Sequence, residues 1–247
     1  MCTATLIQTD PSAPALRLVT NRDELHTRLP ADPPEIRTFG DYQTLLPIDP
    51  QSDGTWIAVN EAGLVITLLN LNPEQAPTPR PGLRSRGGVV PSLMGCSTVK
   101  QAIEIAKELP TQTMMPFRLL LADRDNVATV RADGQSVATA VHPIADAPVM
   151  LTSSGLGDHI VEGPRRDLFE SAPPRDAEAQ DAFHRHRWPD RTPVSVAMCR
   201  EDARTVSRTV VEIDAHRVQM HYTPVSMYGG EGELQVLTLP LRAEAKG

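Results

Sequence analysis

A cysteine, Cys2, directly follows the initiating methionine and begins an alternating, strand-like run. If Met1 is removed, one carbon atom carries both a thiol nucleophile and an α-amine, whose ordinary pKa of about 7.7–8 suits a general base. A free thiol has a pKa of about 8.5, so it needs such a base or a nearby positive charge to react at neutral pH. Cys2 is therefore a candidate nucleophile. The alternative is an incidental thiol on an edge strand.

The stretch NRDE could supply the charges that such a nucleophile needs. It follows a second predicted strand, whose end would lie beside Cys2 in a hairpin. Arg22 could then hold the thiolate or bind an acidic substrate group. Asp23 or Glu24 could orient the amine or Arg22. The alternative is a surface loop that leads into a helix, with Asn21 as the N-cap and the acidic residues in the first turn.

The stretch GTWIAVNEAGLVITLLN, residues 54–70, predicts another hairpin. Its strands flank a short EAG turn, in which Gly63 can supply the positive φ. The second strand ends in Asn70, whose side-chain amide could donate a hydrogen bond to a developing oxyanion. The alternative is that Asn70 simply ends the strand.

The rest of the chain predicts mostly strands, roughly eleven in all, with helices in two blocks. The first hairpin has strands over residues 3–9 and 15–21. Proline-rich residues 28–54 and 72–82 predict loops that could wall a pocket. A helix is expected over residues 97–110, with Ser97 as its N-cap, and further helical stretches over 165–171 and 177–186. Later strands are expected over residues 117–123, 126–132, 135–141, 148–154, 194–199, 205–213, 217–222 and 233–239.

This order of elements favours an α+β fold over an alternating βαβ fold. Two antiparallel sheets with helices outside them, a four-layer αββα sandwich, would bury such strands well. We expect residues 1–247 to form one domain.

The composition limits the possible functions. The chain has 247 residues, 40% of them hydrophobic, and a net charge of −7, which argues against nonspecific binding to nucleic acid or anionic lipid. The longest apolar run is too short to span a membrane, and the start of the chain lacks the basic segment of a signal peptide. We therefore expect a cytoplasmic protein that acts on a small molecule, without membrane insertion.

Metal and redox sites are not indicated. The three cysteines, Cys2, Cys96 and Cys199, are widely spaced, which argues against a disulfide framework or a CxxC site. His184 and His186 lie two residues apart, a poor spacing for two ligands on one helix face. We expect neither a metal nor another cofactor.

Four motifs in this order resemble the NRDE-motif family, also called the Transport and Golgi organisation family: MCT at the start, NRDE, the 54–70 hairpin, and SRG at residues 85–87. More distantly, VNEAGLVITLLN is similar to a segment of the choloylglycine hydrolases and penicillin acylases. Those enzymes are N-terminal nucleophile hydrolases. The resemblance implies the αββα sandwich and, in the hydrolases, catalysis by a processed N-terminal cysteine.

The resemblance also implies roles for individual residues. Cys2 matches the nucleophile, and Asn70 matches the residue that lines the oxyanion hole. Arg22, with Asp23 or Glu24, falls where the hydrolases have an Arg and an Asp beside the nucleophile. Because the order of these residues differs, the resemblance does not decide which acid takes the Asp role.

The same comparison suggests substrate-binding residues. Asn21 is an alternative to Arg22 for the Arg position, and Glu24 is a further candidate. Ser153 falls where both families usually show Asn, and Arg208 is matched with a late Arg of the hydrolases.

These interpretations of the sequence lead to two hypotheses about function. The first is an N-terminal-cysteine amidohydrolase that cleaves a small linear amide or N-acyl compound through an acyl-enzyme. The second is a non-enzymatic binding or trafficking protein of the NRDE family, with a haem-like or acyl-lipid-like ligand.

Overall fold

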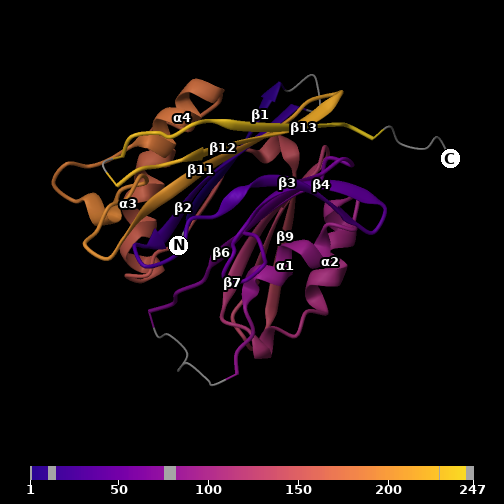
Figure 1. The fold of residues 1–247 in the computed structure, drawn as a ribbon, viewed down its shortest axis with the longest axis horizontal. Helices are drawn as coiled ribbons and strands as arrows, with labels where there is room; N and C mark the ends of the chain where they lie inside the picture. Colours follow the sequence, from indigo (N-terminus) through magenta and orange to yellow (C-terminus); the bar gives the residue numbers. More distant parts are fainter. Residues whose placement is uncertain (1, 11–14, 75–81, 228, 243–247) are drawn as a thin grey trace.

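The computed structural model describes residues 2–10, 15–74, 82–227 and 229–242. These residues form a four-layer αββα sandwich, which confirms the α+β prediction. Figure 1 shows two sheets face to face, with α3 and α4 outside one sheet and α1 and α2 outside the other. The helices span Val89–Leu93 (α1), Val99–Lys107 (α2), Asp158–Ser171 (α3) and Ala177–Arg185 (α4).

Both sheets are antiparallel throughout. The first has the order β10-β1-β2-β11-β12-β13, and the second runs in sequence order from β3 to β9. The strands of the first sheet are Cys2–Asp10 (β1), Ala15–Leu25 (β2), Val149–Thr152 (β10), Ala203–Ile213 (β11), Arg217–Pro224 (β12) and Gln235–Pro240 (β13). Those of the second are Asp32–Phe39 (β3), Tyr42–Ile48 (β4), Ile57–Asn60 (β5), Val65–Asn70 (β6), Phe117–Ala122 (β7), Asn126–Ala132 (β8) and Val137–Pro143 (β9).

Alternation along the strands separates two environments on the first sheet. Leu16 and Leu18 of β2 point into the apolar core between the sheets, where they meet Ile57 and Val59 of β5. The opposite face of the same sheet lies under α3 and α4 and carries buried polar side chains such as Thr5, Arg17 and Asn21. The buried Arg165 of α3 lies in the same layer. Successive residues of a strand therefore serve different layers.

Several predicted elements have different bounds. Residues 28–54 are not a loop throughout, because they contain β3 and β4. Pro33 and Pro34 fall in β3, which is an edge strand and so tolerates residues without an N–H. The strand predicted over residues 194–199 is wrong: a 3₁₀ turn, Thr192–Val194, leads into an irregular segment there. Most of the proline-rich stretch 72–82 lies outside the described residues.

The helix predicted over residues 97–110 is α2, with a different N-cap. The Thr98 hydroxyl accepts a hydrogen bond from the Gln101 N–H, and Ser97 is the residue that precedes this N-cap. The short helix α1 was not predicted, and α3 begins seven residues before the predicted helical stretch, at Asp158. No helix in the described part of the chain is long and apolar enough to cross a membrane.

Candidate active site

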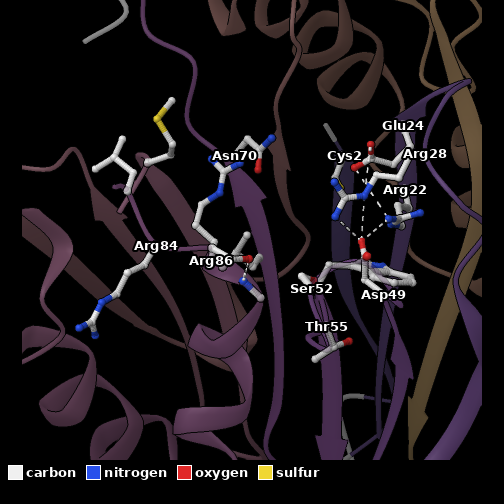
Figure 2. Close-up of a pocket in the computed structure, with 16 residues that line it drawn as sticks. Cys2, Arg22, Glu24, Arg28, Asp49, Ser52, Thr55, Asn70, Arg84 and Arg86 are labelled. Carbon is white, nitrogen blue, oxygen red and sulfur yellow. Dashed lines mark hydrogen bonds and ion pairs between the residues drawn. The ribbon is translucent and has the colours of Figure 1, made fainter. Parts of the chain in front are cut away.

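A cavity of about 440 Å³ opens at one end of the two sheets and contains the side chain of Cys2. Figure 2 shows it with the strands that supply its walls. Its lining comes from both sheets and from the segment that precedes α1. The lining residues are Cys2, Arg22, Glu24, Arg28, Asp49, Ser52, Thr55, Trp56, Leu68, Asn70, Leu83, Arg84, Ser85, Arg86, Gly87 and Met115.

The first hairpin brings Cys2 and Arg22 together. The register of β1 and β2 places the two residues directly opposite each other, so their side chains leave the same face of the sheet. The backbone of Cys2 is held from the other side by Ser153. The Cys2 N–H donates to the Ser153 hydroxyl at 3.1 Å, and the Ser153 N–H donates to the Cys2 carbonyl at 2.8 Å. Ser153 thus contacts the backbone of Cys2 and does not line the cavity.

The environment of Cys2 keeps its thiol protonated at rest. Burial raises the pKa of the Cys2 thiol, and the negative charges of Asp23 and Glu24 raise it further, while Arg22 opposes the shift. A thiol in this state can act as a nucleophile only if a base accepts its proton.

A cluster of charges forms one wall of the cavity. The Arg22 guanidinium donates to Asp49 Oδ2 at 2.8 Å, and Arg28 donates to the same oxygen through Nε at 3.0 Å and Nη2 at 2.7 Å. Glu24 lies 3.9 Å from both guanidinium groups. The Arg22 guanidinium also lies over the Trp56 ring, 4.6 Å from its centre. Arg22 is therefore held by Asp49 and Trp56, in addition to lying beside the thiol (Figure 2).

Asn70 lies on the other side of the cavity, at the end of β6. Its half-buried side-chain amide lines the cavity and makes no hydrogen bond to another described residue. The amide N–H groups are therefore available to a ligand. Three candidate residues, Cys2, Arg22 and Asn70, line the same cavity, and Glu24 joins them.

Asn21 and Asp23 do not line the cavity, because the alternation of β2 turns them toward α3 and α4. The Asn21 amide donates to the carbonyl oxygens of His184 and Val196 at 2.8 and 3.1 Å. Asp23 Oδ1 accepts a hydrogen bond of 2.6 Å from the Thr205 hydroxyl, while its buried Oδ2 has no partner among the described residues.

Burial raises the pKa of the Asp23 carboxyl from 3.8 to about 6. The Arg165 charge and the hydrogen bond from Thr205 both oppose this shift and are outweighed. Asp23 therefore ionises near pH 6, well above the usual range of a carboxyl group.

Arg208 lies in a different cavity from Cys2. Its guanidinium forms an ion pair of 2.8 Å with Glu231 and lines a separate hollow of about 280 Å³, together with Asn21. In the register of β2 and β11, Arg208 is the partner of Asn21, which explains why both face the helices.

The buried histidine His184 has a structural environment. Its Nε2 is 2.7 Å from the Thr5 hydroxyl and its Nδ1 is 3.2 Å from Asn21 Oδ1. Burial, and then the charges of nearby arginines, lower the pKa of His184 well below its ordinary value, so the ring is neutral. The described residues contain no cluster of three or more His, Cys, Asp or Glu side chains that could hold a metal ion.

Some lining residues had no predicted role. Arg28 and Asp49 fall within the stretch 28–54 that was predicted as a loop, and Trp56 approaches them only through the pairing of distant strands. Arg86 lies within the SRG motif, which was singled out without a function. A charged residue inside a motif is the one signal that could have identified it.

The fold of the chain has the architecture of the N-terminal nucleophile hydrolases. Among solved structures it is similar to penicillin V acylase from Agrobacterium tumefaciens, with 16% identity, a TM-score of 0.53, and coverage of 90% of this chain and 83% of that one. It is also similar to the R18L variant of conjugated bile acid hydrolase from Clostridium perfringens, with 12% identity, a TM-score of 0.58, and coverage of 98% and 97%.

A third similar structure is the Caenorhabditis elegans orthologue of N-acylethanolamine-hydrolyzing acid amidase, with 13% identity, a TM-score of 0.53, and coverage of 85% of this chain and 92% of that one. At these identities the likeness establishes the fold. No curated protein sequence matches the chain. Residues 1–166 match the family model described as Transport and Golgi organisation 2, and the chain belongs to this family. The resemblance drawn from the sequence motifs is thereby confirmed.

Proposed function

We propose that this protein is an amidohydrolase whose nucleophile is Cys2 after removal of Met1, acting on a small amide or N-acyl compound. The observation that carries the proposal is the presence in one cavity of the Cys2 thiol and of the Asn70 amide, which makes no hydrogen bond to another described residue. The structural neighbours support the class, since their names are those of an acylase, a hydrolase and an amidase.

In the proposed reaction the Cys2 sulfur attacks the amide carbonyl carbon, and the α-amine of Cys2 accepts the thiol proton. Asn70 donates a hydrogen bond to the oxyanion that forms. The C–N bond then breaks, and the leaving amine takes the proton from the α-ammonium group. Water attacks the resulting thioester, which releases the carboxylic acid and restores the thiol.

The raised pKa of Cys2 is compatible with this sequence of steps, because the proton moves during attack rather than before it. The Ser153 hydroxyl, 3.1 Å from the Cys2 nitrogen, would position the free amine. Asp23 would stabilise the ammonium form, since its Oδ2 is buried without a partner among the described residues and its charge acts on Cys2.

The proposal is tested by mass and by turnover. Intact mass spectrometry should show a chain that begins at Cys2, and a screen of N-acyl amines should find one whose amine is released. Cys2→Ala should abolish release, and Cys2→Ser should slow it by at least about a hundredfold, because an alcohol is a much weaker nucleophile at neutral pH. Cys199→Ser, at a half-buried thiol outside the cavity, is the matched control and should retain full activity.

Asn70→Ala should lower kcat by about a hundredfold or more, with a smaller effect on KM, because the hydrogen bond to the oxyanion exists only in the transition state. A retained Met1, or full activity in Cys2→Ala, would refute the mechanism.

The burial of Cys2 favours a second candidate function, a binding protein without turnover. A neutral, enclosed thiol contributes to a pocket as a small apolar group. In that case a haem-like or acyl-lipid-like ligand would bind equally well to Cys2→Ala and to the unaltered protein, and no compound in the screen would be cleaved.

A further inference from the structure

The cavity around Cys2 carries excess positive charge in a protein whose net charge is −7. Its lining contains four arginines and two acidic residues. Arg22 and Arg28 are paired with Asp49, and Glu24 lies beside both. The remaining two arginines, Arg84 and Arg86, come from the segment before α1, and neither forms an ion pair with a described residue.

The side chains of Arg84 and Arg86 point in different directions. Arg84 is exposed and extends away from Cys2, whereas Arg86 is half-buried and extends toward Asn70 (Figure 2). Within the described part of the chain, the Arg86 guanidinium makes one hydrogen bond, from Nη1 to the Pro116 carbonyl at 3.0 Å. A guanidinium has five N–H donors, so most of those on Arg86 remain available.

The backbone that carries Arg86 is held firmly against the second sheet. The Ser85 hydroxyl caps the 3₁₀ turn by accepting a hydrogen bond from the Gly87 N–H at 3.1 Å. The Gly87 carbonyl accepts one from the Thr55 N–H at 3.1 Å. Gly54 and Gly87 approach so closely that a Cβ on Gly54 would lie 2.4 Å from the Gly87 Cα. Arg86 is thus presented by a fixed segment.

The position of Arg86 is electrostatically costly without an anion. Burial lowers the pKa of the Arg86 guanidinium, while the charges of Cys2 and Glu24 oppose the shift. The guanidinium therefore lies within electrostatic range of the nucleophile. A partly buried cation with no carboxylate partner gains free energy when an anion binds beside it.

We infer, on the basis of the proposed function, that the substrate carries a carboxylate near its scissile amide and that Arg86 binds this carboxylate. Arg86 is then a specificity-determining residue, distinct from Arg22, whose charge is already compensated by Asp49. The planar fork of the guanidinium suits two parallel hydrogen bonds to a carboxylate.

The inference can be tested without knowledge of the substrate and without turnover. Iodoacetate and iodoacetamide alkylate a thiol at the same carbon, by displacement of iodide, and differ in the negative charge of the former. The measured quantity is the ratio of their rate constants at Cys2, followed by peptide mass spectrometry. Because both reagents require the same thiolate, the ratio is independent of the pKa of Cys2.

Arg86→Met should lower the iodoacetate-to-iodoacetamide ratio about tenfold, because a half-buried charge attracts an anion strongly. Arg86→Lys should restore part of the ratio, because it keeps the charge but loses the second parallel hydrogen bond. Arg84→Met is the matched control from the same segment and should change the ratio less than about twofold. Added salt should lower the ratio in the unaltered protein toward that of Arg86→Met.

An unchanged ratio in Arg86→Met, or an equal fall in Arg84→Met, would overturn the inference. If Arg86→Met fails to fold, Arg86→Lys and the salt dependence still decide it. A ratio that depends on Arg86 in a protein that cleaves no amide would refute the proposed function and leave the anion site standing. Cleavage of neutral and carboxylate-bearing amides at equal rates, with no effect of Arg86→Met, would refute the anion site and leave the proposed function standing.

Discussion

Replacing Asp23 by Asn should stabilise the protein near neutral pH and reduce the pH dependence of its stability. The Asp23 side chain lies under α3 and α4 with only 1% of its surface exposed. One carboxyl oxygen accepts a hydrogen bond from Thr205, and the other has no partner among the described residues. A charge in this position is only partly compensated, although the nearby Arg165 favours it.

The magnitude follows from the pKa. Burial raises the pKa of Asp23 from 3.8 to about 6, so the folded protein holds a proton between these pH values that the unfolded chain has lost. The free energy of unfolding therefore falls as the pH rises through this window. At about 1.4 kcal/mol for each pH unit, the loss reaches about 3 kcal/mol above pH 6 and is nearly absent below about pH 4.

Urea denaturation at about pH 7.5 and about pH 4 would measure the free energy of unfolding above and below this pH window. Asp23→Asn cannot ionise but keeps an oxygen to accept the Thr205 hydrogen bond, so we expect it to be more stable than the unaltered protein by about 3 kcal/mol at the higher pH and by less than about 1 kcal/mol at the lower. Asp41→Asn, at an exposed carboxylate, is the control and should change stability by less than about 0.5 kcal/mol at either pH. A gain that is equal at both pH values, or no gain at all, would contradict the assignment of a buried, ionised Asp23.

Three other substitutions test the fold by urea denaturation. Asp49→Asn should destabilise the protein by about 3 kcal/mol, because it leaves the buried guanidinium of Arg22 without its main partner. A loss below about 0.5 kcal/mol would show that the pair of Arg22 and Asp49 contributes little to stability. Thr98→Ala should cost about 1 kcal/mol through loss of the N-cap of α2, whereas Ser97→Ala should be nearly neutral; the opposite order would support the sequence-based N-cap. Gly54→Ala should cost about 1–3 kcal/mol, because its methyl group would displace segment 83–87; unchanged stability would show that this segment is not packed as described.

The fold was largely predictable because the strands alternate clearly and are separated by glycine, proline and acidic turns. The failures have two physical causes. Proline density indicated a loop where β3 lies, but an edge strand has a free side and tolerates Pro33 and Pro34. Alternating Val194, Val196 and Met198 indicated a strand, but the last two are buried in an irregular segment. Burial on one side produces alternation with or without strand pairing.

From local pattern alone the candidate site was predictable only where it depends on strand pairing, and the family resemblance added Asn70, which lies on the other sheet. The hairpin of β1 and β2 places Cys2 opposite Arg22, and a hairpin is specified by nearby residues. Asp49 and Arg86 reach the cavity through contacts between distant parts of the chain, which no local pattern encodes. The motif SRG drew attention to Arg86 but could not indicate that its side chain lines the cavity.

The strand geometry of β2 also explains why the four residues of the NRDE stretch do not share one site. Arg22 and Glu24 face the cavity and set the charge around Cys2, whereas Asn21 and Asp23 face the helices. A shift of β2 by one residue against β1 would exchange the two pairs, because alternate residues leave opposite faces. It would place carboxylate and amide groups beside the thiol and bury Arg22 under α3 and α4. The register of this one strand pair therefore decides which side chain of the NRDE stretch lies opposite Cys2.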